Sequence, residues 1–185
     1  NESISDFGNI DPDLANFNVV DPYVSAVYIT DFGLSINAGG RLNIHSNYGN
    51  NFVYDTNLAF GIVKNETINL KLISSYSTAF IAPSLYQLFS DYGATNLAPE
   101  TNRTFEFGFE SKLGQQWALS AVYYNRVEEN KVIFLNLPTP PYGIYANALE
   151  TIDVSGIEAD VTFTISRELT TIVGYAFVDK TSDID

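Results

Sequence analysis

Residues 101–113 read Thr-Asn-Arg-Thr-Phe-Glu-Phe-Gly-Phe-Glu-Ser-Lys-Leu, and aromatic and polar side chains alternate along this stretch. Phe105, Phe107 and Phe109 fall on one side of an extended chain and Glu106 falls on the other, because successive strand residues point to opposite faces. A helical period of 3.6 residues does not reproduce this pattern. The stretch therefore predicts a β-strand that has one aromatic face and one charged face.

The same period of two recurs along most of the chain. It predicts strands at roughly residues 22–31, 33–46, 52–63, 67–78, 101–113, 116–130, 149–166 and 170–180. Soluble strands usually have about five or six residues, whereas a tilted membrane-spanning strand needs about 9 to 11. Several of the expected strands run to ten residues or more. Their length therefore favours an antiparallel transmembrane β-barrel.

The connections between these strands alternate between short and long. Tight turns are expected at residues 31–33, 64–66, 114–115 and 167–169. The segments 78–100 and 127–148 are long and contain prolines. Outer-membrane barrels show the same asymmetry, with short turns on the periplasmic side and longer loops outside. The exception is the Asn- and Gly-rich segment 47–51, which is short on the side where a long loop is expected.

Composition excludes several classes of function. Nine basic and 22 acidic residues give a net charge of −13, which would repel nucleic acid. The chain has no Cys and a single His, so thiolate metal sites and most His-based catalytic sites are excluded by counting. We therefore expect no catalytic residues, no cofactor and no metal site, and we interpret His45 as a polar surface residue. The chain is not expected to be an enzyme.

A soluble β-sandwich is the main alternative on periodicity alone, because its strands alternate in the same way. Sandwich cores favour Val, Ile and Leu, whereas many apolar positions here are Phe or Tyr. Aromatic girdles at the two membrane interfaces would use such residues. The expected girdle residues are Tyr76, Tyr123, Tyr124, Tyr145 and Tyr175.

Three linked motifs carry a resemblance to a known family. Residues 77–89 read Ser-Thr-Ala-Phe-Ile-Ala-Pro-Ser-Leu-Tyr-Gln-Leu-Phe, residues 96–100 read Asn-Leu-Ala-Pro-Glu, and residues 104–108 read Thr-Phe-Glu-Phe-Gly. Their order and spacing resemble the barrel of TonB-dependent outer-membrane receptors. Asn147 and the later sequence Val-Ser-Gly-Ile-Glu at 154–158 are similar to further elements of the same barrel.

This resemblance implies a large barrel of about 22 strands closed around an N-terminal plug domain. Residues 1–185 would then be an incomplete part of the barrel domain, without the plug and without the terminal strand. The sequence at 181–185, which lacks a closing aromatic residue, fits that expectation. Ile81 departs from the family pattern, which has a basic residue there. A closed eight-stranded barrel with a structural or adhesive role remains an alternative.

The resemblance also implies a location and a function. It implies a protein of the bacterial outer membrane that imports a scarce nutrient, such as a siderophore or other metal chelate, a cobalamin-like compound or an oligosaccharide. The implied partners are outer-membrane lipid, the ligand, and TonB acting through the missing plug, and a surface lipoprotein stays open. Exposed aromatic residues in the two long loops are the expected ligand-proximal positions: Tyr86, Phe89, Tyr92, Tyr142 and Tyr145. Residues 82–89 are expected to form a single helical turn.

Overall fold

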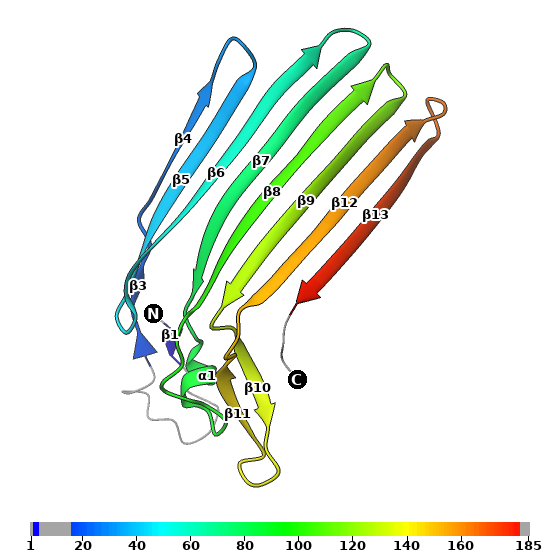
Figure 1. Cartoon of the computed structure of the whole chain (residues 1–185). Coiled ribbons are helices and arrows are strands. Elements are labelled where there is room, and N and C mark those ends of the chain that lie inside the picture. Colours follow the sequence, from blue (N-terminus) through cyan, green and yellow to red (C-terminus); the bar gives the residue numbers. More distant parts are fainter. Residues whose placement is uncertain (1, 4–15, 182–185) are drawn as a thin grey trace.

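The computed structural model describes residues 2–3 and 16–181 and consists mainly of one nine-stranded antiparallel sheet (Figure 1). Its strands follow one another in the order β13-β12-β9-β8-β7-β6-β5, and both β3 and β4 pair with β5. Their bounds are β3 (Val19–Val20), β4 (Tyr23–Ile29), β5 (Leu34–His45), β6 (Gly49–Lys64), β7 (Ile68–Ile81), β8 (Glu100–Leu113), β9 (Trp117–Glu129), β12 (Ile152–Thr164) and β13 (Thr170–Thr181). All eight predicted strands are confirmed.

The remaining elements lie beyond one end of this sheet, where the two long connections β7–β8 and β9–β12 are found and which we call the loop end (Figure 1). They are the short helix α1 (Leu85–Phe89), the hairpin β10 (Val132–Asn136) and β11 (Gly143–Asn147), and the pair β1 (Glu2–Ser3) and β2 (Asn16–Phe17). The helical turn was predicted, whereas the β10–β11 hairpin falls where we expected only a loop. No helix in the described part of the chain is long and apolar enough to cross a membrane.

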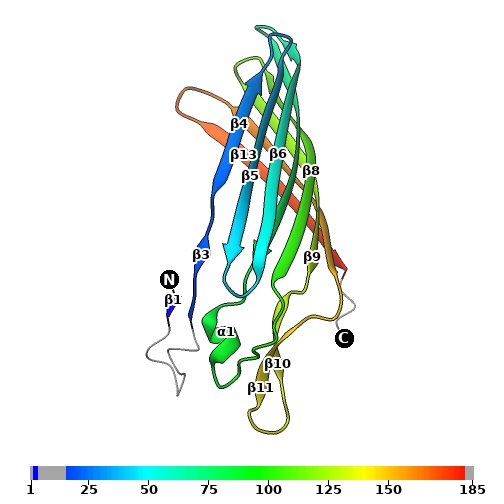
Figure 2. The same ribbon diagram turned by 90° about the vertical axis from the view of Figure 1, so that its left-hand side faces the viewer.

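The sheet is open in the described part of the chain, because β4 and β13 lie at its two edges and do not pair with each other. Figure 2 shows the same sheet from its side, with β13 crossing behind β4 at an angle. A sandwich needs two packed sheets, and a small barrel needs its first and last strands to pair. Both alternatives to a large-barrel sector are therefore wrong. The sequence at 182–185 lies outside the described residues.

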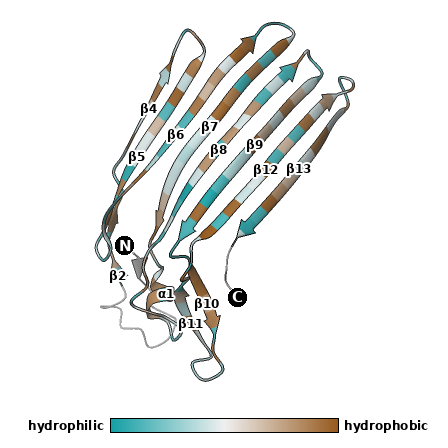
Figure 3. Cartoon of the chain, in the orientation of Figure 1, coloured by the Kyte–Doolittle hydropathy of each residue, from teal (hydrophilic) through white to brown (hydrophobic). Residues whose placement is uncertain are grey.

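Because of the register, the apolar residues of neighbouring strands lie side by side on one face of the sheet and the polar residues lie on the other. Leu72 pairs with Phe109, which pairs with Ala121, so apolar residues continue along one face. On the opposite face Lys71 pairs with Glu110, which pairs with Ser120. Figure 3 shows the resulting alternation of hydrophobic and hydrophilic bands along the strands. The sheet thus has one apolar face and one polar face.

The apolar face is not covered by any other part of the described chain. Phe52 is 65% exposed, Phe107 is 50% exposed and Tyr175 is 63% exposed. In water, such a broad apolar surface would be an aggregation site, whereas in a bilayer it meets hydrocarbon. We therefore identify it as the lipid face, and the polar face as the lumenal face.

Aromatic rings gather near both ends of the lipid face. Near the loop end, the rings of Phe52, Tyr54 and Tyr76 follow one another with centroid separations of 6.0 and 5.9 Å. Near the tight-turn end, Trp117 stacks on Phe163 at 4.2 Å. Interfacial aromatic residues of this kind mark the two borders of the hydrocarbon.

The five expected girdle residues do not all lie on the same face. Tyr76, Tyr123 and Tyr175 lie on the lipid face, because each shares register with an apolar neighbour. Tyr124 lies on the lumenal face, because it directly follows Tyr123 in a strand. Its ring covers Gly156, where an added Cβ would lie 2.5 Å from the Tyr124 Oη atom. Tyr145 is not in the sheet at all, since it belongs to β11.

The connections have the predicted asymmetry. Tight turns join β4 to β5, β6 to β7, β8 to β9 and β12 to β13, and Gly114 supplies the positive φ of +59° that one of them needs. Residues 82–99 and 130–151 form the two long connections at the other end, and we call these two segments together the loop rim. The β5–β6 connection is shorter than expected, because β6 already begins at Gly49.

The assignment of the two faces can be tested with two neighbouring residues of β9. Ala121 lies midway along the lipid face, and Ser120 lies on the lumenal face between Glu110 and Asp160. We expect Ala121→Arg to destabilise the folded barrel by about 2–4 kcal/mol, since it places a charge in the hydrocarbon. Ser120→Arg should be tolerated, because two carboxylates flank it. Heat-dependent migration of the complete receptor on SDS gels measures the difference.

Equal loss of folded barrel in both variants would contradict the assignment. Loss confined to Ser120→Arg would reverse it.

Candidate functional site

The tightest packing of the described chain lies in and beside the loop rim rather than in the sheet. Both faces of the sheet are open, whereas the rim encloses a small apolar core. This core consists of Pro83, Leu85, Leu88, Leu97, Ala148 and Ile152, all less than a tenth exposed. The rim is therefore a packed unit that presents a defined surface.

Helix α1 begins with a complete capping box. The Ser84 Oγ atom accepts a hydrogen bond from the Gln87 backbone N–H at 3.3 Å, and the Ser84 N–H donates to Gln87 Oε1 at 2.8 Å. This arrangement satisfies donors that a helix start leaves unpaired. Leu85 and Leu88 then face the core, while Tyr86 stays 39% exposed.

Four aromatic rings of the rim form one continuous contact chain. Tyr86 meets Tyr145 at 6.1 Å, Tyr145 meets Phe134 at 5.1 Å, and Phe134 meets Tyr92 at 5.7 Å between ring centroids. All three contacts are edge-to-face, the arrangement that aromatic quadrupoles favour. We call these four residues the aromatic cluster.

The cluster brings together three of the five predicted ligand-proximal residues, namely Tyr86, Tyr92 and Tyr145. Phe89 ends α1, and Tyr142 stands at the tip of the β10–β11 hairpin with a φ of +65° and 65% exposure. Neither ring joins the cluster. Phe134 was missed, although residues 132–136 are an uncharged, mostly apolar run that pairs with residues 143–147.

Specific hydrogen bonds join the separate segments of the rim. The Tyr145 N–H donates to the Tyr92 carbonyl oxygen at 2.9 Å, which links β11 to the 82–99 segment. The Tyr48 hydroxyl, from the β5–β6 turn, donates to the Leu97 carbonyl oxygen at 3.1 Å. Asn147 links the two long connections through its side-chain amide.

A three-residue ion network lies at the base of the hairpin. Glu128 is 2.8 Å from the Arg126 guanidinium and 2.8 Å from the Lys131 ammonium group, and its side chain is 14% exposed. It lies on the lumenal side of β9 near the loop end, where the adjacent residue Val127 on the other face is already flanked by the charged residues Arg103 and Asp153. The hydrogen bond from Lys131 is the largest cause that lowers the pKa of Glu128; burial opposes it, and nearby positive charge adds to it.

His45 is buried, so the interpretation as a polar surface residue was wrong. It is only 3% exposed at the loop end of β5, and its ring lies 4.6 Å from Phe17 and 4.9 Å from Tyr48. Its Nδ1 atom accepts the Asn47 N–H at 3.1 Å. Burial lowers the pKa of His45, and the negative charge of Asp21 opposes that shift. The side chain therefore closes the β5–β6 turn through its contacts with Phe17, Tyr48 and the Asn47 N–H.

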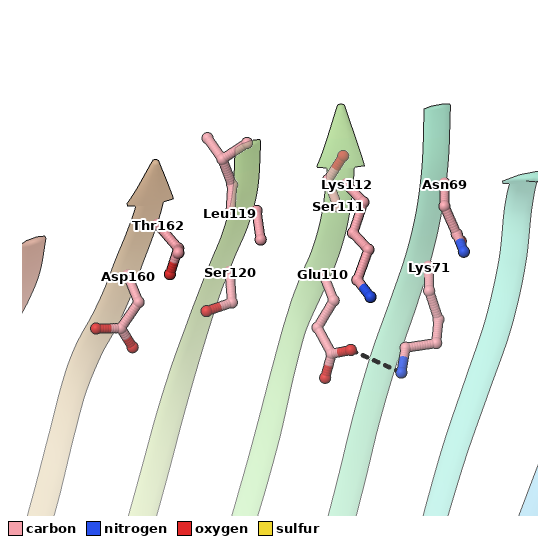
Figure 4. A pocket seen from close by; sticks show the side chains of 10 residues that line it. Asn69, Lys71, Glu110, Ser111, Lys112, Leu119, Ser120, Asp160 and Thr162 are labelled. Carbon is pink, nitrogen blue, oxygen red and sulfur yellow. Dashed lines mark ion pairs between the residues drawn. The ribbon is translucent and has the colours of Figure 1, made fainter. Parts of the chain in front are cut away.

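Charged and polar side chains also gather on the lumenal face near the tight-turn end (Figure 4). Lys71 and Glu110 form an ion pair at 2.7 Å, and Lys112, Asp160 and Thr162 line the same open cavity of about 400 Å³. Hydrated charges are expected on the lumenal side of a barrel wall. Within the described residues no group of three His, Cys, Asp or Glu side chains is placed to hold a metal ion.

These features define a class of protein: one sector of a large outer-membrane β-barrel with a packed external loop rim. The sequence profile described as "TonB dependent receptor-like, beta-barrel" matches residues 1–185. The chain therefore belongs to the TonB-dependent receptors, which are transporters of the outer membrane and not enzymes.

Solved structures share the fold. The siderophore receptor PirA from Pseudomonas aeruginosa superimposes with a TM-score of 0.78 at 21% identity over 90% of this chain. The RagAB peptide transporter gives 0.71 at 16% identity over 89%, and the copper transporter OprC gives 0.70 at 14% over 88%. The chain spans 35%, 22% and 28% of the lengths of these three proteins.

The Glu128 network predicts a pH-dependent contribution to stability. A carboxylate whose pKa is lowered by folding stabilises the folded state above its ordinary pKa of 4.5, and this contribution is lost as the pH falls through the lowered value. We expect Glu128→Gln to cost about 1 kcal/mol at pH 7 and progressively less below about pH 4.5. Thermal unfolding of the complete receptor in detergent measures both values.

Glu150→Gln is the matched control, because Glu150 is an exposed rim carboxylate without an ion-pair partner in the described chain. A Glu128→Gln cost that stays constant from pH 7 to pH 3 would contradict the ion-network account.

Proposed function

We propose that this chain supplies one sector of the wall and outer rim of a receptor that imports a scarce nutrient across the outer membrane. Membership of the TonB-dependent receptor family supports this proposal, as does the similarity to a siderophore receptor, a peptide transporter and a copper transporter. In this proposal, residues 1–185 belong to a single barrel domain. A plug domain and TonB supply gating and energy coupling from outside this chain.

The aromatic cluster is the observation that carries the proposed ligand contact. Tyr86 and Tyr92 are 39% and 38% exposed, so the cluster combines packed edges with rings open to the outside. Aromatic surfaces on a rigid support bind the flat or apolar parts of small ligands at low entropic cost. We place ligand contact at Tyr86, Tyr92, Phe134 and Tyr145, with Phe89 and Tyr142 flanking the same rim.

The charges around the cluster favour a neutral or cationic ligand. The loop rim, residues 82–99 and 130–151, contains one basic residue, Lys131, which is paired with Glu128, and two carboxylates, Asp91 and Glu150. Arg41, Arg103, Arg126 and Lys131 near the loop end are each already paired with a carboxylate, and the positive charge of Lys180 acts on Glu128. A polyanionic ligand would therefore lose hydration without gaining a free counter-charge from this sector. An uncharged metal chelate, a cobalamin-like compound, an oligosaccharide, a peptide or a free metal cation fits these charges.

Uptake by the complete receptor tests this proposal. Cells that carry or lack the receptor gene are given labelled probes one at a time: a neutral ferric trihydroxamate, a trianionic ferric tricatecholate, cyanocobalamin, maltoheptaose, an uncharged pentapeptide and Cu²⁺. We expect receptor-dependent uptake of a neutral or cationic probe, abolished by a protonophore because TonB coupling uses the inner-membrane proton gradient. Uptake of the tricatecholate alone would contradict the charge argument, and uptake of none would contradict the import function.

Substitution of single rings locates the contact. Tyr86→Ala and Phe134→Ala each remove one ring of the cluster, and we expect about a tenfold rise in the KM for the transported probe, equivalent to about 1.4 kcal/mol. Phe32→Ala is the matched control, because Phe32 is 68% exposed in a tight turn at the opposite end of the sheet. Equal KM values for all three variants would place ligand contact elsewhere in the receptor.

A further inference from the structure

The Asn147 side chain contacts both long connections of the rim at once. Its Oδ1 atom accepts the Ala98 N–H at 2.8 Å, and its Nδ2 atom donates to the Ala98 carbonyl oxygen at 2.9 Å. The same Nδ2 atom donates to the Asn130 carbonyl oxygen at 2.6 Å. A primary amide has two donor hydrogens, so the donor capacity of Asn147 is fully used.

The two hydrogen bonds to Ala98 have the pattern of a hydrogen-bonded residue pair in an antiparallel sheet. The Ala98 N–H donates and the Ala98 carbonyl oxygen accepts, and the side-chain amide of Asn147 takes the place of the backbone of the second strand. This fixes both the position and the orientation of the peptide groups around Ala98. No other side chain in the described rim makes a two-point bond to the backbone of the other long connection.

The third bond fixes the base of the β10–β11 hairpin. Asn147 is the last residue of β11 and pairs with Val132, and the next N–H, of Ala148, donates to the Lys131 carbonyl oxygen at 2.7 Å. The bond from Asn147 to Asn130 extends this closure by one residue, at a position whose φ is +56°. The amide thus holds the hairpin base and the 82–99 segment together.

The position of Asn147 connects these bonds to the aromatic cluster. Tyr145 lies two residues earlier on the same side of β11, and its N–H bonds to the Tyr92 carbonyl oxygen. Leu97 and Ala148, the chain neighbours of Ala98 and Asn147, are both buried in the core of the rim. The two halves of the cluster, Tyr86 and Tyr92 on one segment and Phe134 and Tyr145 on the other, meet only if the two segments keep this register.

We propose that Asn147 is a positioning residue that holds the β10–β11 hairpin against the 82–99 segment, so that the aromatic cluster is preformed as a ligand surface. The role in ligand binding rests on the proposed function. The role in holding the two segments in a fixed relative position rests on the hydrogen bonds alone. Preformation lowers the entropic cost of binding, so loss of Asn147 weakens ligand capture without slowing later transport steps.

Asn147→Asp is the direct test. The substitution keeps the size of the side chain and its acceptor, removes both donors, and places a carboxylate against two carbonyl oxygens. Asn136→Asp is the matched control: it makes the same chemical change at the last residue of β10, where the side chain is exposed and makes no hydrogen bond within the described chain. Asn147→Ser is a milder second variant, in case the aspartate prevents folding.

Hydrogen exchange of the complete receptor, followed by mass spectrometry, gives a readout that does not depend on the ligand. We expect backbone amides of 90–98 and 143–148 to exchange at least about tenfold faster in Asn147→Asp, and by a smaller factor in Asn147→Ser. In Asn136→Asp these amides should exchange as in the wild type. Unchanged exchange in both Asn147 variants would overturn the proposal.

Transport kinetics give the second readout, with whichever probe of the uptake panel the wild-type receptor accumulates. We expect the KM of Asn147→Asp to rise about tenfold and the maximal rate to stay within about twofold of the wild type. Faster exchange with an unchanged KM would overturn the role in ligand capture. A wild-type receptor that takes up no probe would refute the proposed function, and the exchange rates would still decide whether Asn147 registers the two segments.

Discussion

Backbone hydrogen bonding is the constraint on which the rest of this structure depends. A bilayer offers no water to an unpaired N–H or C=O group, so a β-strand can cross it only if both neighbours satisfy its backbone. The inner strands of the sheet meet this demand by continuous pairing: β7 and β8 are in register from Ile68 opposite Leu113 to Ile81 opposite Glu100 without a break. A register shift between β6 and β7, at Gly61 to Val63, lies near a tight turn. With the backbone satisfied by neighbouring strands, the side chains of the two faces can serve two different solvents.

That division explains where the chain has a core. A soluble sheet buries one face, whereas this sheet gives one face to lipid and the other to the lumen, and so most of its strand residues stay accessible. The buried apolar residues gather instead in and beside the rim, which lies beyond the hydrocarbon and must hold its shape in water. Its small core, the capping box of α1 and the hydrogen bonds of the Asn147 amide therefore hold the loops in place, as backbone pairing between strands holds the sheet together. The aromatic cluster results from that packing.

The alternation of apolar and polar residues was enough to predict the strands of the sheet. A strand with one face in lipid and the other in water alternates between apolar and polar residues along its whole length. It was not enough for the rim. The β10–β11 hairpin was missed because its prolines at 138, 140 and 141 lie in the tip, which made the whole uncharged segment read as a loop. Phe134 was missed with it. Tyr124 was wrongly predicted to lie on the lipid face because it is a tyrosine. Tyr123 and Tyr124 are adjacent in one strand and must therefore face opposite sides. The burial of His45 depends on Phe17, a contact between residues that no local pattern links.

The central claim is that this chain is a wall sector whose apolar face meets lipid. A spin-label scan along β9 tests it most directly. Residues 1–185 contain no Cys, so each label site from residue 118 to 124 needs one introduced cysteine, in a receptor in which any cysteine outside residues 1–185 is replaced by serine. In the complete receptor reconstituted in a bilayer, collision with oxygen should be highest at 119, 121 and 123, and collision with a polar nickel chelate should be higher at 118, 120, 122 and 124. An accessibility profile without a period of two, or one with the two phases exchanged, would contradict the account.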